Sequence, residues 1–148
     1  MSLQKEVMVK MKEAMKLKDT TALEALRALK SAFLLANTSG SGVELSESDE
    51  IKIVQKLVKQ RKDSAVIFTE QGREDLAEPE LAQSAVLEKF LPAQMSEEEI
   101  TAVIEKIIAD TGASSMKDMG KVMGIASKQL AGKADGKTIS GIVKSSLS

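Results

Sequence analysis

The sequence predicts an all-α protein, with an N-terminal helical bundle of about four helices followed by a small C-terminal domain of three helices. Only three of the 148 residues are aromatic, all of them Phe, so the side chains that strands favour are scarce. Ala, Leu, Lys, Glu and Met are abundant instead, and these residues favour helices. Apolar side chains also recur at helical rather than strand spacing along most of the chain.

Four helices are expected before the first strong boundary. They cover residues 3–18, 22–37, 46–71 and 73–91. Thr21 with Glu24 has the pattern of a capping box at the start of the second helix, and Ser46 with Asp49 has it at the start of the third. A flexible Gly/Ser-containing loop at 38–46 is expected between them.

The domain boundary is expected where the helical pattern stops near the second proline. Gly72 ends the third helix, and Pro79 fits the first turn of the fourth. Residues 1–92 then form the N-terminal domain, and the linker 93–95 joins it to the C-terminal domain at 96–148.

The C-terminal domain has its own helix-start signals. Ser96 with Glu99 forms a second clear capping box, and Ser115 with Asp118 has a similar pattern. Asp135 is placed to cap the last helix, since its side chain can accept a backbone amide. The three helices are expected to end near residues 111, 130 and 147.

Composition excludes several classes of active site. The chain has no Cys and no His, so it lacks Ser-His-Asp and Cys-His catalysis and every thiolate or imidazole metal site. No catalytic residue, metal or cofactor is therefore expected. The N-terminus does not have the pattern of a signal peptide, and no apolar run approaches the ~18 residues of a membrane span. The sequence predicts a cytoplasmic protein that binds no membrane.

The stretch AGKADGKTIS, residues 131–140, has the last letters of a phosphate-binding P-loop. The P-loop pattern requires a Gly four residues before its Gly-Lys-Ser/Thr, but Gly132 is separated from Gly136 by three residues. The preceding segment also has helical rather than strand periodicity. We therefore interpret the stretch as a helix junction and not as a nucleotide site.

The last quarter of the chain is basic although the net charge is −1. Residues 112–148 contain six lysines and only two acidic residues, Asp118 and Asp135. The lysines are Lys117, Lys121, Lys128, Lys133, Lys137 and Lys144. Such a stripe is usually a solvated face, but the near absence of acidic neighbours favours a surface that neutralises phosphates.

The helix expected at 116–130 has two glycines beside its lysines. Gly120 and Gly124 each cost ~1 kcal/mol of helix stability relative to Ala. They either let a neighbouring helix pack closely, the slightly favoured interpretation, or let the backbone of a ligand approach. Met116 and other methionines would face the core, since core filling accounts for them better than a partner groove.

Arg61 falls within the apolar arc of the third helix. A buried guanidinium must be paired. The carboxylates available as partners are Glu70, Glu74, Asp75 and Glu88. We expect a structural ion-pair network between helices, and a catalytic role is a distant second interpretation.

Several blocks of the sequence resemble the GatB/YqeY family, specifically its stand-alone YqeY-like members. The blocks are LVKQRKDS, GREDLAE, LEKFLPAQMSEEEI and MKDMGKVMG, followed by Gly132, ADGK and IV. They occur in the expected order over nearly the whole chain. The resemblance implies an all-α fold with an N-terminal bundle and a small C-terminal domain. The chain departs from the family at IASKQL, where relatives often have a Pro and more basic residues.

The resemblance also implies a function. Related domains form the tail of the B subunit of a glutamine-dependent tRNA amidotransferase, where they are implicated in holding tRNA while the chemistry lies elsewhere. Carried over to this chain, the positions expected near tRNA are Lys117, Gly120, Lys121, Gly124, Asp135, Gly136 and Lys137. The leading hypothesis is a non-catalytic tRNA-binding accessory protein. The alternatives are an adaptor that docks on a tRNA synthetase or amidotransferase and, last, an enzyme in its own right.

Overall fold

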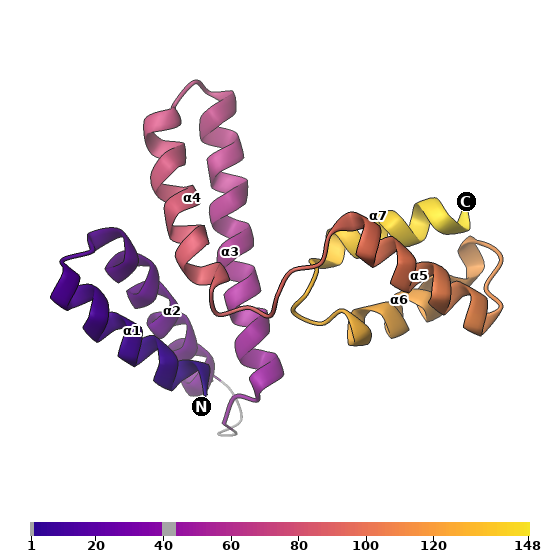
Figure 1. The fold of residues 1–148 in the computed structure, drawn as a ribbon, viewed down its shortest axis with the longest axis horizontal. Coiled ribbons are helices and arrows are strands. Elements are labelled where there is room, and N and C mark those ends of the chain that lie inside the picture. The colour runs from indigo at the N-terminus through magenta and orange to yellow at the C-terminus, as the bar shows by residue number, and fades with distance from the viewer. Residues whose placement is uncertain (1, 40–43) are drawn as a thin grey trace. The chain divides into compact units, whose positions relative to one another are not determined.

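All regular structure in the described part of the chain is helical. The computed structural model describes residues 2–39 and 44–148, which contain seven α-helices, one 3₁₀ turn and no strand (Figure 1). The helices are α1 (Leu3–Leu17), α2 (Thr20–Ser39), α3 (Glu47–Glu70), α4 (Glu74–Glu88), α5 (Glu97–Thr111), α6 (Met119–Gln129) and α7 (Gly136–Leu147), with the 3₁₀ turn η1 (Met116–Asp118) before α6. The all-α class predicted from the sequence is confirmed.

Two of the predicted capping boxes are present. At the start of α3, Ser46 Oγ accepts the amide of Asp49 at 3.1 Å and Asp49 Oδ2 accepts the amide of Ser46 at 3.2 Å. At the start of α5, Ser96 Oγ accepts the amide of Glu99 at 3.2 Å, and the Glu99 carboxylate bonds back to the amide of Ser96. Each box satisfies amides that the first helical turn leaves without an intrahelical partner.

The start of α2 differs from the prediction. The helix begins at Thr20, and Asp19 Oδ1 accepts the amide of Ala22 at 3.0 Å. The capping box predicted from Thr21 and Glu24 was therefore wrong. Lys18 takes a left-handed conformation with φ 54°, which turns the chain immediately after α1 and makes Asp19 the first residue able to cap α2.

The prediction for Pro79 also needs correction. Because α4 begins at Glu74, Pro79 lies inside the helix, in its second turn, and removes the amide that would bond to the carbonyl of Asp75. The predicted loop at 38–46 is tested only in part, since α2 continues to Ser39 and residues 40–43 lie outside the described residues.

The chain separates into two compact units, Met1–Leu91 and Pro92–Ser148. In the first, α1 and α2 form one antiparallel hairpin, α3 and α4 form another, and α2 contacts both helices of the second hairpin (Figure 1). The core of the first unit consists of Val7, Ala14, Ala25, Leu26, Leu29, Phe33, Val54, Val58 and Leu87.

The second unit has a separate core built by three helices. Each of α5, α6 and α7 contacts the other two, which is the arrangement of a small three-helix bundle. Its buried residues are Ile100, Ile104, Ile107, Val122, Ala126, Leu130, Ala134, Ile139, Val143 and Leu147. The buried residues of α6 lie on one face, so the opposite face, which carries lysines, is exposed to solvent.

Candidate nucleic-acid interface

The start of α6 is shaped by a short 3₁₀ turn. Ser115 Oγ accepts the amide of Lys117 at 3.4 Å, and the turn continues into α6 at Met119. The sequence predicted a regular α-helix from Met116, and this start is a correction. Because a 3₁₀ turn has three residues per turn, Met116 falls off the core face and is 42% exposed.

The solvent face of α6 carries the expected lysines. Lys121 and Lys128 are exposed, and they lie on the side of α6 opposite the buried Val122 and Ala126. Lys117, also exposed, lies in the preceding turn η1. Two positive charges are thus held along one face of α6 by residues that are fixed in the core, and the charge of Lys117 precedes them in η1.

The two glycines of α6 lie on this same exposed side. A Cβ atom built on Gly120 or Gly124 would meet no atom within 4 Å among the described residues. Close packing of a neighbouring helix, the slightly favoured interpretation from the sequence, therefore does not account for them within this chain. They leave a strip of bare helical backbone between the lysines, open to an outside partner.

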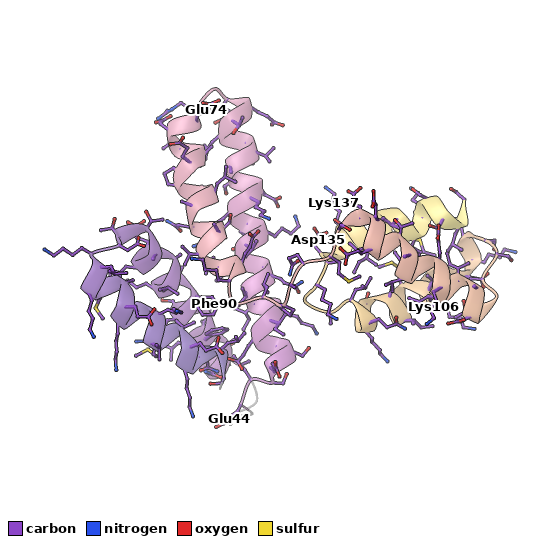
Figure 2. All side chains as sticks on the ribbon, in the orientation of Figure 1. Glu44, Glu74, Phe90, Lys106, Asp135 and Lys137 are labelled. Atoms are coloured by element: carbon purple, nitrogen blue, oxygen red, sulfur yellow. The ribbon has the colours of Figure 1, made fainter. Side chains whose placement is uncertain are left out.

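Helix α7 also carries exposed lysines with an exposed glycine between them. Asp135 is its N-cap, and its carboxylate accepts the amide of Thr138 at 2.7 Å and the hydroxyl of Thr138 at 3.1 Å. Lys137 and Lys144 are exposed, and the exposed Gly141 between them also has no atom within 4 Å of a built Cβ. Figure 2 shows Asp135 and Lys137 together at the start of this helix.

Gly141 was missed by the sequence analysis, and so were two exposed serines on the same faces, Ser127 and Ser145. The signal that could have found Gly141 is its position four residues after Lys137 on an otherwise solvent-facing side. Gly136, which the sequence analysis did name, is the first residue of α7 and is also exposed and open.

The remaining lysine, Lys133, lies in the turn between α6 and α7, where hydrogen bonds hold the backbone. Gly132 is buried and has φ 77°, a conformation that glycine adopts without strain. Gln94 Nε2 donates to the carbonyl of Gly132 at 2.7 Å, and the amide of Met95 donates to the carbonyl of Lys133 at 3.0 Å. Lys133 itself remains exposed.

The positive charges of this surface are not neutralised inside the unit. Among the described residues, none of the six lysines from Lys117 to Lys144 forms an ion pair. The two acidic residues nearby are engaged locally, since Asp135 caps α7 and Asp118 Oδ2 accepts the amide of Ser114 at 3.1 Å. The exposed acidic side chains gather on α5 instead. They are Glu97, Glu98, Glu99, Glu105 and Asp110.

Arg61 has partners different from those expected. Its Nε donates to Gln83 Oε1 at 3.0 Å, and its NH1 donates to the carbonyl of Leu57 at 3.3 Å. Gln83 Nε2 in turn donates to Glu24 Oε2 at 3.1 Å, so the side-chain amide of Gln83 links the guanidinium of Arg61 to the carboxylate of Glu24. Arg61 is half-buried rather than enclosed, which explains why neutral acceptors are sufficient.

The four carboxylates expected around Arg61 lie elsewhere. Glu88 pairs with Lys62, and Asp75 pairs with Arg73 at 3.0 Å, which lowers the pKa of Asp75 through that hydrogen bond. Glu70 and Glu74 are exposed, and Figure 2 shows Glu74 at the tip of the α3–α4 hairpin. The expected ion-pair network is therefore replaced by a hydrogen-bonded relay and two separate surface pairs.

Comparison with known proteins places the chain in a family. Residues 4–147 match the family model described as Yqey-like protein. The chain belongs to the YqeY-like family. This confirms the family resemblance found in the sequence blocks, and the match includes both structural units.

Two relatives indicate the range of proteins that contain YqeY-like sequence. The chain is 32% identical over 138 residues to "Altered inheritance of mitochondria protein 41, mitochondrial" of Kluyveromyces lactis, covering 92% of this chain and 71% of that protein. It is 30% identical over 106 residues to a glutamyl-tRNA(Gln) amidotransferase subunit of Thermococcus gammatolerans, covering 69% of this chain but 17% of that subunit. The YqeY-like chain thus corresponds to a small part of a much larger amidotransferase subunit.

Two further observations bear on location and metal binding. None of the helices in the described ranges combines the length and the apolar character needed to cross a membrane. The relatives named as protein 41 in Kluyveromyces lactis and in Clavispora lusitaniae are mitochondrial, so the cytoplasmic location expected from the sequence stays a prediction. Within residues 2–39 and 44–148, no group of three or more potential ligand side chains is placed to hold a metal ion.

Proposed function

We propose that this YqeY-like protein is a non-catalytic accessory protein that holds tRNA through its C-terminal unit. The observation that carries the proposal is the pair of exposed faces on α6 and α7, where lysines without acidic partners flank glycines that nothing in the described chain covers. Lysine ammonium groups bind phosphates as point charges, and bare helical backbone allows the sugar-phosphate chain to come close. The relationship to part of a glutamyl-tRNA(Gln) amidotransferase subunit supports tRNA as the nucleic acid.

The proposed binding is dominated by the phosphate backbone. Direct base recognition in proteins relies mainly on Arg, Asn, Gln and aromatic side chains, and the exposed positions on the α6 and α7 faces are mostly Lys, Gly and Ser. We therefore expect affinity to fall steeply with salt and to differ little among tRNAs. Each lysine–phosphate contact contributes about 0.7–0.9 to the slope of log affinity against log salt concentration.

A mobility-shift titration of tRNA tests the proposal. The variant Lys117→Glu/Lys121→Glu/Lys128→Glu reverses the charges of the exposed lysines of η1 and α6. A matched control, Lys5→Glu/Lys12→Glu/Lys16→Glu, makes the same charge change on exposed lysines of α1. Both variants change the net charge from −1 to −7, because each substitution removes one positive charge and adds one negative charge.

The expected result is selective loss of binding by the α6 variant. Its affinity should fall by at least tenfold and its salt slope by about 2–3, as expected for three lost phosphate contacts. The α1 control should keep most of the wild-type affinity. Equal losses in both variants would mean that only net charge matters. No binding by the wild-type protein near physiological salt would refute the tRNA proposal.

A second candidate function is a protein–protein adaptor that docks on a tRNA synthetase or amidotransferase. A surface of the first unit favours it. Large apolar side chains on α1 and α2 are exposed, including Met8 at 41%, Met15 at 52% and Leu34 at 62%. The test is pull-down of a purified amidotransferase or synthetase by the wild-type protein and by Met8→Lys/Leu34→Lys. Wild-type capture that this variant loses, with tRNA binding unchanged, would favour the adaptor.

A further inference from the structure

The C-terminal unit lacks the side chains with which proteins hold unpaired bases. The three Phe residues of the chain, Phe33, Phe68 and Phe90, precede the second unit, and so do its three Arg residues, Arg27, Arg61 and Arg73. Proteins that bind single strands stack bases on aromatic rings or on guanidinium planes, and such stacking contributes about 1–3 kcal/mol per base. Residues 92–148 have neither kind of group.

The exposed α6 and α7 faces instead offer small groups between separated charges. On α6, Gly120, Gly124 and Ser127 lie among the lysines, and on α7 Gly141 and Ser145 do so. Serine hydroxyls can donate to and accept from phosphates and ribose 2′-hydroxyls. Small residues let that contact occur close to the helix, across the wide and shallow minor groove of an A-form duplex.

The spacing of the lysines favours a stiff ligand. Lys121 and Lys128 of α6 are seven residues apart in the sequence, which corresponds to about 10 Å along the helix. A paired helix already holds phosphates at fixed distances of this order. A flexible strand must be ordered to reach the same lysines, and without stacking nothing compensates the lost conformational entropy.

We infer that the exposed lysine-bearing faces of α6 and α7 bind a base-paired RNA segment and not an unpaired strand. The inference rests on the proposed function and specifies which part of an RNA the C-terminal unit contacts. The acidic α5 sets the orientation, because its exposed carboxylates, including Glu98 and Glu105, repel phosphates and keep that side of the unit turned away from the RNA.

A competition assay with the full-length protein tests the inference. Labelled tRNA is bound to the protein and then displaced by an RNA duplex of about 16 base pairs, which is a typical span for a duplex-binding domain. The other competitors are an unstructured oligouridine strand with the same number of phosphates and a DNA duplex of the same length. We expect the RNA duplex to displace tRNA at concentrations about tenfold lower than the single strand, since no stacking is available to the single strand.

The results separate this inference from the proposed function. If tRNA binds and oligouridine displaces it as well as the RNA duplex does, the inference is wrong and the proposed function stands. Equal displacement by the DNA duplex would remove the role of the 2′-hydroxyl and would also overturn the assignment to RNA. If tRNA itself does not bind, both proposals are wrong.

A glycine variant provides a second test that does not depend on charge. In Gly124→Gln a side chain occupies the bare strip between the lysines, and the fold tolerates it because a Cβ there meets no atom within 4 Å. We expect Gly124→Gln to lose about tenfold in duplex affinity while its thermal stability is unchanged or higher, because Gln has the better helix propensity. Full duplex affinity in Gly124→Gln would contradict close approach of the RNA.

Discussion

At the scale of the residue, the exposed glycines of α6 and α7 are costly for helix stability. Glycine inside a helix is less favourable than alanine by about 1 kcal/mol, chiefly because it loses more backbone freedom on folding. At Gly124 and Gly141 the described chain provides no close packing that would offset this cost. We therefore expect that substitutions of these glycines which stabilise the helix will weaken tRNA binding.

The substitution Gly124→Ala tests this opposition. It should raise the free energy of unfolding by about 1 kcal/mol, since the methyl group meets open space and the helix propensity improves. The same change should weaken tRNA binding modestly, because the backbone is partly covered. Urea denaturation and a tRNA titration of the one variant measure both effects, and a loss of stability would contradict the open environment described for Gly124.

At the scale of the element, the caps decide where the helices begin, and one cap lies within the basic surface. Asp135 both caps α7 and adds one of the two negative charges in residues 112–148. These two roles are separable, because Asn caps a helix about as well as Asp and carries no charge.

Asp135→Asn should leave the free energy of unfolding within about 0.5 kcal/mol of wild type, whereas Asp135→Ala should lower it by about 1 kcal/mol through loss of the cap. Asp135→Asn should also bind tRNA more tightly than wild type, since a repulsive charge is gone. Denaturation curves and tRNA affinities of the two variants check this. Equal stability of both variants would argue against the observed cap.

The capping box of α3 makes a prediction about pH. The pKa of Asp49 lies below its usual 3.8, because the side chain and the backbone of Ser46 donate hydrogen bonds to its carboxylate. A carboxylate with a lowered folded-state pKa adds stability above its unfolded pKa, and this stability is lost as the pH falls through the folded value. Wild type should therefore be more stable than Asp49→Asn at pH 7, and the difference should shrink below about pH 4. Urea midpoints of wild type and Asp49→Asn, measured at pH 7 and below about pH 4, test this prediction. An equal difference in stability at both pH values would contradict it.

At the scale of the whole molecule, the two units have separate cores that share no residue. We therefore propose that each unit folds by itself. A fragment of residues 92–148 should give a helical circular dichroism spectrum and a cooperative, although shallow, thermal transition, since a domain of about 60 residues buries a modest share of its surface. A disordered fragment would show that the second unit depends on the first.

The sequence was sufficient for some local features, although the Thr21–Glu24 box, also a pair three residues apart, is replaced by the Asp19 cap. The Ser46 and Ser96 caps each involve residues three positions apart, and composition with helical periodicity predicted the all-α class. It was insufficient where a partner lies far along the chain. Glu24 bonds to Gln83, 59 residues away, and Gln83 also takes the place of a carboxylate beside Arg61. Such pairings depend on how helices pack, which periodicity does not specify.

The candidate surface could also be predicted only in part from the sequence, because its exposure depends on how the helices pack. The lysines could be found from their number and spacing, but the sequence left two explanations open for Gly120 and Gly124. Only the positions of the neighbouring helices show that both glycines face open space. Gly141 was overlooked because its exposure depends on the buried Ile139 and Val143, which set the orientation of α7.

The turn at Gly132 and Lys133 has a consequence for proteolysis. Trypsin cleaves after lysine and requires an extended, accessible backbone, but the carbonyl of Lys133 is held by the amide of Met95 and the next residue, Ala134, is buried. Cleavage after Lys133 must therefore wait for local opening of the C-terminal unit, although the side chain of Lys133 is exposed. The rate of this single cut then reports how often the segment before α5 separates from the α6–α7 turn.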